Sequence, residues 1–333
     1  MHMALSLPLL IGLIVVALAF DLLNGLHDAA NSIATVVSTR ALKPHHAVAG
    51  AAFFNFIAFV FFGTHVAHTI GTGIIGAHTI NAQVIFGALM GGIVWNLLTW
   101  FMGMPSSSSH ALIGGLIGAG VAKAGLSTIV WTGVIKTALA ILISPALGLV
   151  LGLVLMLAVA WSSIRSTALQ VDRRFRKLQL VSAALYSLGH GSNDAQKTMG
   201  IIAVLLYSQG LLGENFYVPV WVVLSCQAAM ALGTLMGGWR IVHTMGARIT
   251  RLTPPQGFSA EAGGALTLFM ATYLGIPVST THTITGAVVG VGISRRVSAV
   301  RWNVASSIIV AWVVTIPAAA LIGAAFYGLA SLL

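Results

Sequence analysis

The chain has 333 residues, of which 58% are hydrophobic and 7% charged, and its mean hydropathy is +0.98. An ordinary soluble domain carries roughly 25% charged residues, so this composition excludes one and predicts an all-α polytopic membrane protein. The net charge of +10 does not indicate nucleic-acid binding, because the basic residues lie in short loops between apolar runs. The single cysteine, Cys226, excludes an intramolecular disulfide and a cysteine-based metal site.

Apolar runs along the chain predict the membrane-embedded segments. They cover residues 7–37, 47–67, 83–122, 126–161, 178–207, 216–238, 256–293 and 303–331. The runs 7–37 and 178–207 are longer than the ~20 residues that a straight helix needs to span a bilayer. Each contains a Gly/Asp phrase, so we predict a helix break near Asp28 and another near Asp194.

Two other runs are interrupted by similar phrases of Gly, Pro and hydroxyl residues. Gly103–His110 interrupts the run 83–122, and Gly275–His282 interrupts the run 256–293. A Pro beside a Gly ends one helix, and Ser or Thr then caps the next. Non-helical backbone at membrane depth is tolerated only where protein buries it or it lines a cavity. Both runs are therefore predicted to be re-entrant helical hairpins.

The same phrases occur in the same order in each half, since Gly25–Ala29 resembles Gly191–Ala195. We predict two inverted repeats, residues 1–164 and 178–333, joined by a basic cytoplasmic loop at 165–177. Each repeat is expected to have three crossings and one hairpin. With both termini outside the cytoplasm, most Lys and Arg residues fall on the cytoplasmic side, and Lys123 is an exception.

Carboxylates, an amide and an ammonium occur at membrane depth. An Asp in a lipid-embedded helix costs ~2.5–3.5 kcal/mol, so Asp28 and Asp194 are expected to face a polar interior. Asn31 follows Asp28 by one helical turn, and Lys197 holds the corresponding position after Asp194. Asn193 adjoins Asp194. Hydrogen bonding for helix packing is the alternative for the acids. For Lys197, structural pairing with Asp194 competes with anion attraction or occupation of a cation subsite.

The hairpin phrases offer hydroxyl groups at the N-termini of short helices. Unpaired N–H groups, the helix dipole and hydroxyl donors together bind oxyanions, although helix capping alone is the simpler role. The candidate anion-binding residues are Ser106, Ser107, Ser108, Ser109, Ser279, Thr280 and Thr281.

Four histidines adjoin these phrases, namely His27, His110, His190 and His282. They could relay protons, or they could be buried neutral residues. Glu261 lies inside an apolar run, where a carboxylate is costly unless it has a function, so it is a candidate coupling-ion residue. The remaining histidines lie in loops or at helix ends, and we assign no metal site.

These motifs resemble the duplicated signatures of the inorganic phosphate transporter (PiT) family. The phrases Asn24–Asn31 and His190–Ala195 resemble its paired motif, the two hairpin phrases resemble its hairpin motifs, and Phe258–Glu261 resembles a segment carrying an important glutamate. The resemblance implies secondary transport of phosphate coupled to Na⁺ or H⁺, two inverted repeats and a homodimer. The resemblance also implies that the hairpin hydroxyls bind phosphate. The ion- or substrate-site residues that it implies are Asp28, Asn31, Asn193 and Asp194.

Two departures bear on the coupling ion. Sodium-coupled members resemble Asn-Asp-x-x-Asn in both halves, whereas this chain has Lys197 at the last position of the second motif and His27 before the first Asp. A fixed ammonium opposes a sodium ion at that subsite.

The sequence therefore predicts a proton-coupled phosphate symporter of the bacterial inner membrane, with no cofactor and with phosphate and the lipid bilayer as partners. Alternatives are sodium coupling, transport of a divalent metal–phosphate complex, and sulfate transport. An intramembrane serine hydrolase is disfavoured, because one catalytic centre does not need duplicated Ser/His clusters. A passive anion channel is the other remaining class.

Overall fold

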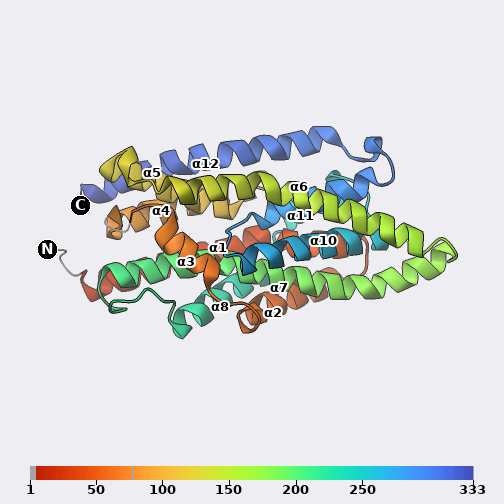
Figure 1. Cartoon of the computed structure of the whole chain (residues 1–333), viewed down its shortest axis with the longest axis horizontal. Coiled ribbons are helices and arrows are strands. Elements are labelled where there is room, and N and C mark those ends of the chain that lie inside the picture. Colours follow the sequence, from red (N-terminus) through yellow and green to blue (C-terminus); the bar gives the residue numbers. More distant parts are fainter. Residues whose placement is uncertain (1–4, 77–78, 333) are drawn as a thin grey trace.

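The computed structural model describes residues 5–76 and 79–332, which form a bundle of helices (Figure 1). Four long helices run along it: α1 (Leu7–Ser38), α6 (Trp131–Ser162), α7 (Ala168–Ser208) and α12 (Trp302–Ser331). The shorter helices are α2 (Pro44–Ile57), α3 (His65–Gly73), α4 (Ala82–Met102), α5 (Ser108–Ala124), α8 (Val220–Met236), α9 (Trp239–His243), α10 (Pro254–Tyr273) and α11 (Thr280–Ile293).

The lengths and apolar composition of these helices confirm a polytopic helical membrane protein. Within the described ranges, α1, α4, α6 and α12 are each long and apolar enough to cross a membrane. Two bent pairs also pass the same test together: α2 with α3, bent by 80°, and α8 with α9, bent by 62°. Because α4 alone is long enough to cross, the re-entrant character of its hairpin stays a prediction.

Both predicted hairpins are helix–break–helix units. The first consists of α4 and α5, and the second of α10 and α11. A glycine with left-handed backbone follows each first arm, a conformation that glycine adopts without strain. Gly103 (φ 65°) directly follows α4, and Gly275 (φ 66°) lies two residues after the end of α10. A proline follows two residues later in both, and the second arm then begins.

The predicted breaks at Asp28 and Asp194 are wrong, because α1 and α7 continue through both motifs. The glycines of the motifs permit close helix packing instead. A Cβ atom at Gly25 would lie 2.1 Å from the carbonyl oxygen of Met230 on α8, and one at Gly191 would lie 2.5 Å from that of Asn55 on α2. Small residues at such contacts let helix backbones approach closely in a membrane.

The breaks occur instead in the next span of each half. The run 47–67, predicted as one crossing, is divided between α2 and α3. The run 216–238 contains a bend near its end at Gly237, whose φ is 63°. The basic stretch 165–177, predicted as a loop, is helical from Ala168 onward. There Thr167 and Gln170 form a capping box that starts α7.

The order of elements is the same in both halves: a long helix, a bent pair, a hairpin and a second long helix. The last helix of each half packs against the hairpin of the other half, so that α12 lies on α4 and α5, and α6 lies on α10 and α11. The start of α1 and the end of α12 lie at one end of the bundle, and the α6–α7 turn lies at the other (Figure 1). The inverted relation of the halves, and the boundaries given for them, stay predictions.

Candidate functional site

A stripe of buried polar side chains runs along one face of α1 and another along one face of α7. On α1 the stripe contains Asp21, Asn24, Asp28, Asn31 and Thr35, and on α7 it contains Gln179, Ser182, Tyr186, His190, Asp194 and Lys197. Spacings of three and four residues put such groups on one side of a helix. Since α1 and α7 pack together, the two stripes supply the polar interior of the bundle.

The hairpin tips meet these stripes in the middle. Ser107 caps α5 by accepting the His110 N–H at 3.3 Å, and Ser279 caps α11 by accepting the His282 N–H at 3.2 Å. Both caps confirm the predicted helix starts. The hydroxyl groups that follow, those of Ser108, Ser109, Thr280 and Thr281, are buried within the first helical turns.

Asp28 receives hydroxyl donors from both hairpins. The Ser108 hydroxyl donates to its Oδ2 at 3.1 Å, and the Thr281 hydroxyl donates to its Oδ1 at 3.3 Å. The His27 Nδ1 lies 2.9 Å from the same Oδ1. On its other side, His27 Nε2 lies 3.1 Å from the Thr99 hydroxyl, to which Ser106 donates at 2.9 Å. Ser106 therefore supports His27 through the Thr99 hydroxyl, and His27 in turn contacts Asp28.

Asp194 forms a buried ion pair with Lys197. The ammonium group donates to Asp194 Oδ1, to the Ser109 hydroxyl of the first hairpin, and, at 2.7 Å, to the Val278 carbonyl oxygen of the second hairpin. Thr280 donates to Asp194 Oδ2 at 2.8 Å. All three ammonium hydrogens thus have acceptors, as a buried lysine requires.

Asn31 and Asn193 bind the second hairpin in different ways. The Asn31 amide donates to the hydroxyls of Thr281 at 2.9 Å and Thr280 at 3.2 Å. Asn193 instead braces the backbone of the tip, since it donates to the Ile276 carbonyl oxygen and accepts the Val278 N–H, both at 3.3 Å. Asn31 lies in the centre itself, and Asn193 holds the hairpin in position.

His190 completes a group with the spacing of a cation site. One ligand atom from each of Asp28, His190 and Asp194 lies within 4.8 Å of the others, and all three residues are buried. His190 Nε2 is 3.2 Å from Asp194 Oδ2, and its Nδ1 lies 3.3 Å from the Asn55 amide oxygen. Carboxylate oxygens with hydroxyl groups nearby can hold a hard cation or a proton.

Glu261 forms a second polar cluster. Its Oε1 accepts from the Thr35 hydroxyl at 2.6 Å and from the Gln179 amide at 2.9 Å, and its Oε2 accepts from the Ser182 hydroxyl at 2.5 Å. Thr35 lies two turns beyond Asp28 on α1, or roughly 10 Å along the helix axis. Glu261 is buried among these polar partners and does not share the Asp28 centre. Its role as a coupling-ion residue stays a prediction.

His110 and His282 contact each other behind the tips rather than the carboxylates. Their ring centroids lie 4.5 Å apart edge to face, and His282 stacks on Trp312 at 3.7 Å. Among the described residues, none of their ring nitrogens has a hydrogen-bond partner. A relay role for this pair stays a prediction.

Several residues of the centre did not figure in the sequence prediction. Tyr186 donates to the Thr280 carbonyl oxygen at 2.9 Å, and Gln196 accepts the N–H groups of Val66 at 2.9 Å and Ala67 at 3.3 Å at the start of α3. Gln196 also donates to the Ser192 carbonyl oxygen at 2.6 Å. Tyr186 lies eight residues before Asp194, and this spacing along α7 is the signal that could have identified it. Gln196 lies two residues after Asp194, on another face of the helix.

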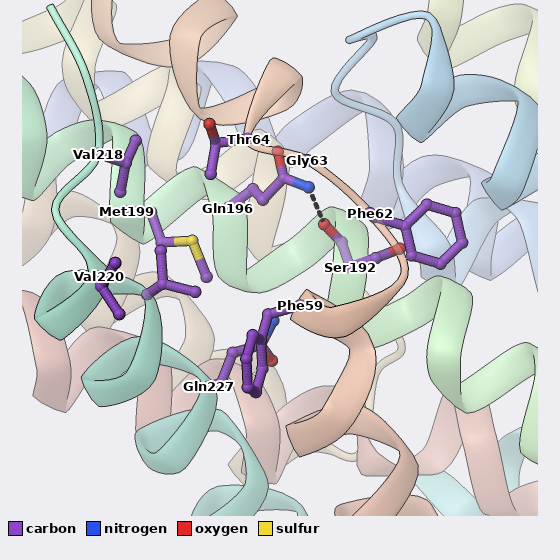
Figure 2. Close-up of a pocket in the computed structure, with 11 residues that line it drawn as sticks. Phe59, Phe62, Gly63, Thr64, Ser192, Gln196, Met199, Val218, Val220 and Gln227 are labelled. Carbon is purple, nitrogen blue, oxygen red and sulfur yellow. Dashed lines mark hydrogen bonds between the residues drawn. The ribbon is translucent and has the colours of Figure 1, made fainter.

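A pocket of about 360 Å³ opens beside this part of α7 (Figure 2). It is lined by the α2–α3 bend, by Ser192, Gln196 and Met199 on α7, and by residues from Val218 to Gln227 before and along α8.

The fold and the site together define a class of protein: a multi-pass helical membrane transporter with a buried centre of carboxylates, one ammonium and two hydroxyl-bearing hairpin tips. Comparison with known proteins narrows this class. The profile described as "Phosphate transporter family" matches residues 24–170 and 162–323, one match for each half. The chain belongs to the phosphate transporter family, and it is a transporter rather than an enzyme.

Similar proteins match this chain over nearly its full length. A "probable low-affinity inorganic phosphate transporter" of Rhizobium meliloti (strain 1021) is 69% identical, and the match covers 100% of this chain and 99% of that protein. A protein of the same description from Bacillus subtilis (strain 168) is 45% identical, with 98% of each chain covered. Among solved structures, "The sodium-dependent phosphate transporter" superimposes with a TM-score of 0.89 at 25% identity, covering 98% of this chain and 100% of that one.

Proposed function

We propose that this protein imports inorganic phosphate by proton-coupled symport with alternating access. The family match and the names of the similar proteins support phosphate as the substrate. The hydroxyls of Ser108, Thr280 and Thr281 and the N-termini of α5 and α11 supply the donors for its oxygens. In this structure these hydroxyls donate to the carboxylates of Asp28 and Asp194. On binding, the oxygens of phosphate would accept these hydrogen bonds in place of the carboxylates.

The charges of the centre favour symport over passage of the anion alone. Asp28 and Asp194 supply two carboxylates, and Lys197 supplies one ammonium, which Asp194 already engages. Two like unit charges 4 Å apart repel by roughly 4 kcal/mol at an effective dielectric constant of 20. Phosphate therefore binds well only when a cation or proton neutralises Asp28, and this requirement links the movement of the two solutes.

The observation that carries the choice of proton is the position of Lys197. It lies three residues after Asp194, as Asn31 lies three residues after Asp28, and its ammonium contacts both hairpin tips. A fixed positive charge at this point satisfies Asp194 without an external cation and repels a sodium ion. Asn31, a neutral amide, exerts no such repulsion in the first half.

The coupling proton has two candidate carriers in this arrangement. His27 lies 2.9 Å from Asp28, so a proton on this pair neutralises the carboxylate that phosphate approaches. Glu261 is the second carrier, held by three hydrogen-bond donors. Phosphate carries a further proton of its own.

That proton on phosphate also gives a basis for selectivity. At neutral pH phosphate can donate a hydrogen bond to Asp28, whereas sulfate has no proton to donate and meets only charge repulsion. We therefore place sulfate below phosphate as a substrate.

Sodium coupling is the second candidate. The solved protein that this chain resembles is named as sodium-dependent, and the 4.8 Å group of Asp28, His190 and Asp194 suits a cation. The same group keeps a divalent metal–phosphate complex among the possible substrates.

We further propose that the protein lies in the bacterial inner membrane as a homodimer with both termini outside the cytoplasm. The Lys/Arg distribution supports the orientation, and the family resemblance supports the dimer.

Uptake of radiolabelled phosphate into proteoliposomes tests the proposal. A proton gradient and a sodium gradient are imposed separately, and a protonophore serves as the control. Proton-driven accumulation in sodium-free buffer is expected. Accumulation with sodium alone supports the second candidate, and equilibration without accumulation supports a channel.

A further inference from the structure

The carboxyl group of Asp21 is fully buried, and the transport scheme above does not use it. Asp21 lies on α1 two turns before Asp28, on the same polar stripe. Neither of its oxygens has a hydrogen-bond partner among the described residues. Most buried polar groups have a hydrogen-bond partner. A buried carboxyl group without one therefore indicates either a bound ion or proton or a functional role.

Polar groups from three helices surround this carboxyl. Asn24 of α1, Thr198 of α7 and Cys226 of α8 adjoin it. None of them reaches hydrogen-bond geometry with it, and Asn24 Oδ1 and Thr198 Oγ1 also lack partners. Four oxygen atoms at the junction of α1, α7 and α8 are therefore unsatisfied.

The charges near Asp21 are negative. Asp194 of α7 faces it and adds to the negative field, and the Cys226 thiol is the titratable group that α8 presents. Lys197, the nearest cation on the stripes, is engaged by Asp194 and the hairpin tips. The helix α4 also packs along α1 and carries no titratable side chain, and the histidines of α2, His45 and His46, are exposed. An ionised Asp21 thus has no counter-ion here.

A single proton removes the uncompensated charge, and a protonated Asp21 has a hydrogen to offer to the unpartnered Asn24 Oδ1. A hard metal cation fits less well, because a thiol adjoins the site and hard cations prefer oxygen ligands. We propose that Asp21 is a further proton-binding residue of the transport cycle, separate from the His27–Asp28 pair and from Glu261.

A pocket borders the same turns of α7 and α8 on another face of these helices, since Met199 and Gln227, which line the pocket of Figure 2, directly follow Thr198 and Cys226. The Gln227 Oε1 in that wall is also unpartnered. In this proposal, Asp21 exchanges its proton on the side of the bundle where this pocket lies. This role rests on the proposed proton coupling.

Infrared spectroscopy of the purified protein tests the protonation without any transport. The C=O stretch of a protonated carboxylic acid is recorded over a pH series for the wild type and for Asp21→Asn. We expect the difference between them to contain one carboxylic-acid band. The matched control is Glu214→Gln, which changes an exposed acid and should leave that band unchanged. If Asp21→Asn folds poorly, Thr198→Val is used instead. It makes the surroundings of Asp21 less polar and so disfavours the ionised form, and the band should therefore persist to higher pH.

Transport then tests the role. Loss of one coupled proton per cycle lowers the phosphate accumulation ratio about tenfold at a gradient of one pH unit, whereas phosphate exchange at equal pH persists. A band that is unchanged in Asp21→Asn overturns the proposal. So does a band that disappears while the accumulation ratio stays at the wild-type value. Absence of proton-driven uptake in the wild type would instead contradict the proposed function itself. The infrared measurement does not depend on transport, so the two failures can be distinguished.

Discussion

Asn31 and Lys197 hold corresponding positions after the two buried aspartates, and each donates to the hairpin of the opposite half. The Asn31 amide donates to Thr281 at 2.9 Å, and the Lys197 ammonium donates to Ser109. Lys197 additionally donates to Val278 in its own half at 2.7 Å. Together with the hydrogen bond from Ser108 to Asp28, these contacts tie both hairpin tips to α1 and to α7, so a change at one carboxylate affects the whole centre.

Removal of the Asp28 charge should stop accumulation. Asp28→Asn keeps the shape of the side chain but eliminates the carboxylate that phosphate and the coupling proton share, so concentrative uptake should be lost while expression persists. The measurement is uptake by proteoliposomes alongside the thermal stability of the purified variant. Wild-type accumulation in Asp28→Asn would return this residue to a packing role.

Asp194→Asn should also abolish uptake, but with a larger loss of stability. It leaves the buried Lys197 ammonium without its counter-ion, and breaking a buried pair costs about 3–5 kcal/mol. Thermal unfolding in detergent should therefore rank Asp194→Asn well below Asp28→Asn. Equal stability of the two variants would contradict the strong pairing of Lys197 with Asp194.

The hydroxyls of the hairpin tips should separate into two groups. Ala at Ser108, Thr280 or Thr281 removes a donor and should weaken phosphate binding by roughly 1–3 kcal/mol. Ala at Ser107 or Ser279 removes a helix cap and should first lower stability by ~1 kcal/mol. Isothermal titration and thermal unfolding measure the two effects. Unchanged affinity in all three members of the first group would move the anion elsewhere.

Gly25 should tolerate no side chain. A Cβ atom there would lie 2.1 Å from the Met230 carbonyl oxygen, whereas one at Gly12 on the same helix meets nothing within 4 Å. Gly25→Val should therefore destabilise the protein by about 3 kcal/mol or more, and Gly12→Val is the matched control. Size-exclusion profiles after heating compare the two, and similar profiles would contradict the close α1–α8 packing.

The parts of this architecture that follow from local chemistry were predictable from the sequence. The Gly-x-Pro phrases with a capping Ser predict the hairpin breaks, and Ser107 and Ser279 do cap their helices. The low charge content predicts the membrane class. Asp28, Asn31, Asp194 and Lys197 also come together as expected, because costly polar groups at membrane depth require one another as partners.

Other features depend on tertiary contacts that sequence patterns do not reveal. From the sequence, Gly25 could equally break α1 or allow another helix to pack closely against it. Only the position of Met230 on α8 shows that it allows close packing. The partners of Glu261 come from two other helices, α1 and α7. Its separation from Asp28 therefore could not be predicted from the sequence. Asp21 is not among the predicted site residues, although it lies seven residues before Asp28 and therefore on the same face of α1.

Cysteine labelling should establish the orientation. In intact cells a cysteine at Ser166 should resist an impermeant maleimide, whereas one at Ser331 should react, because the former is predicted to be cytoplasmic. Both positions are exposed, and the native Cys226 is buried and should contribute little background. The opposite pattern would overturn the predicted topology.

Substitution of Lys197 tests most directly whether a fixed ammonium takes the place of a second coupling cation. Phosphate uptake by wild type and Lys197→Asn is measured at fixed pH with and without an inward sodium gradient, and in sodium-free buffer with an inward proton gradient. We expect the wild type to respond to protons and not to sodium, and Lys197→Asn to gain sodium stimulation as the amide restores the symmetric motif. Strong sodium stimulation of the wild type with no response to the proton gradient would contradict the account.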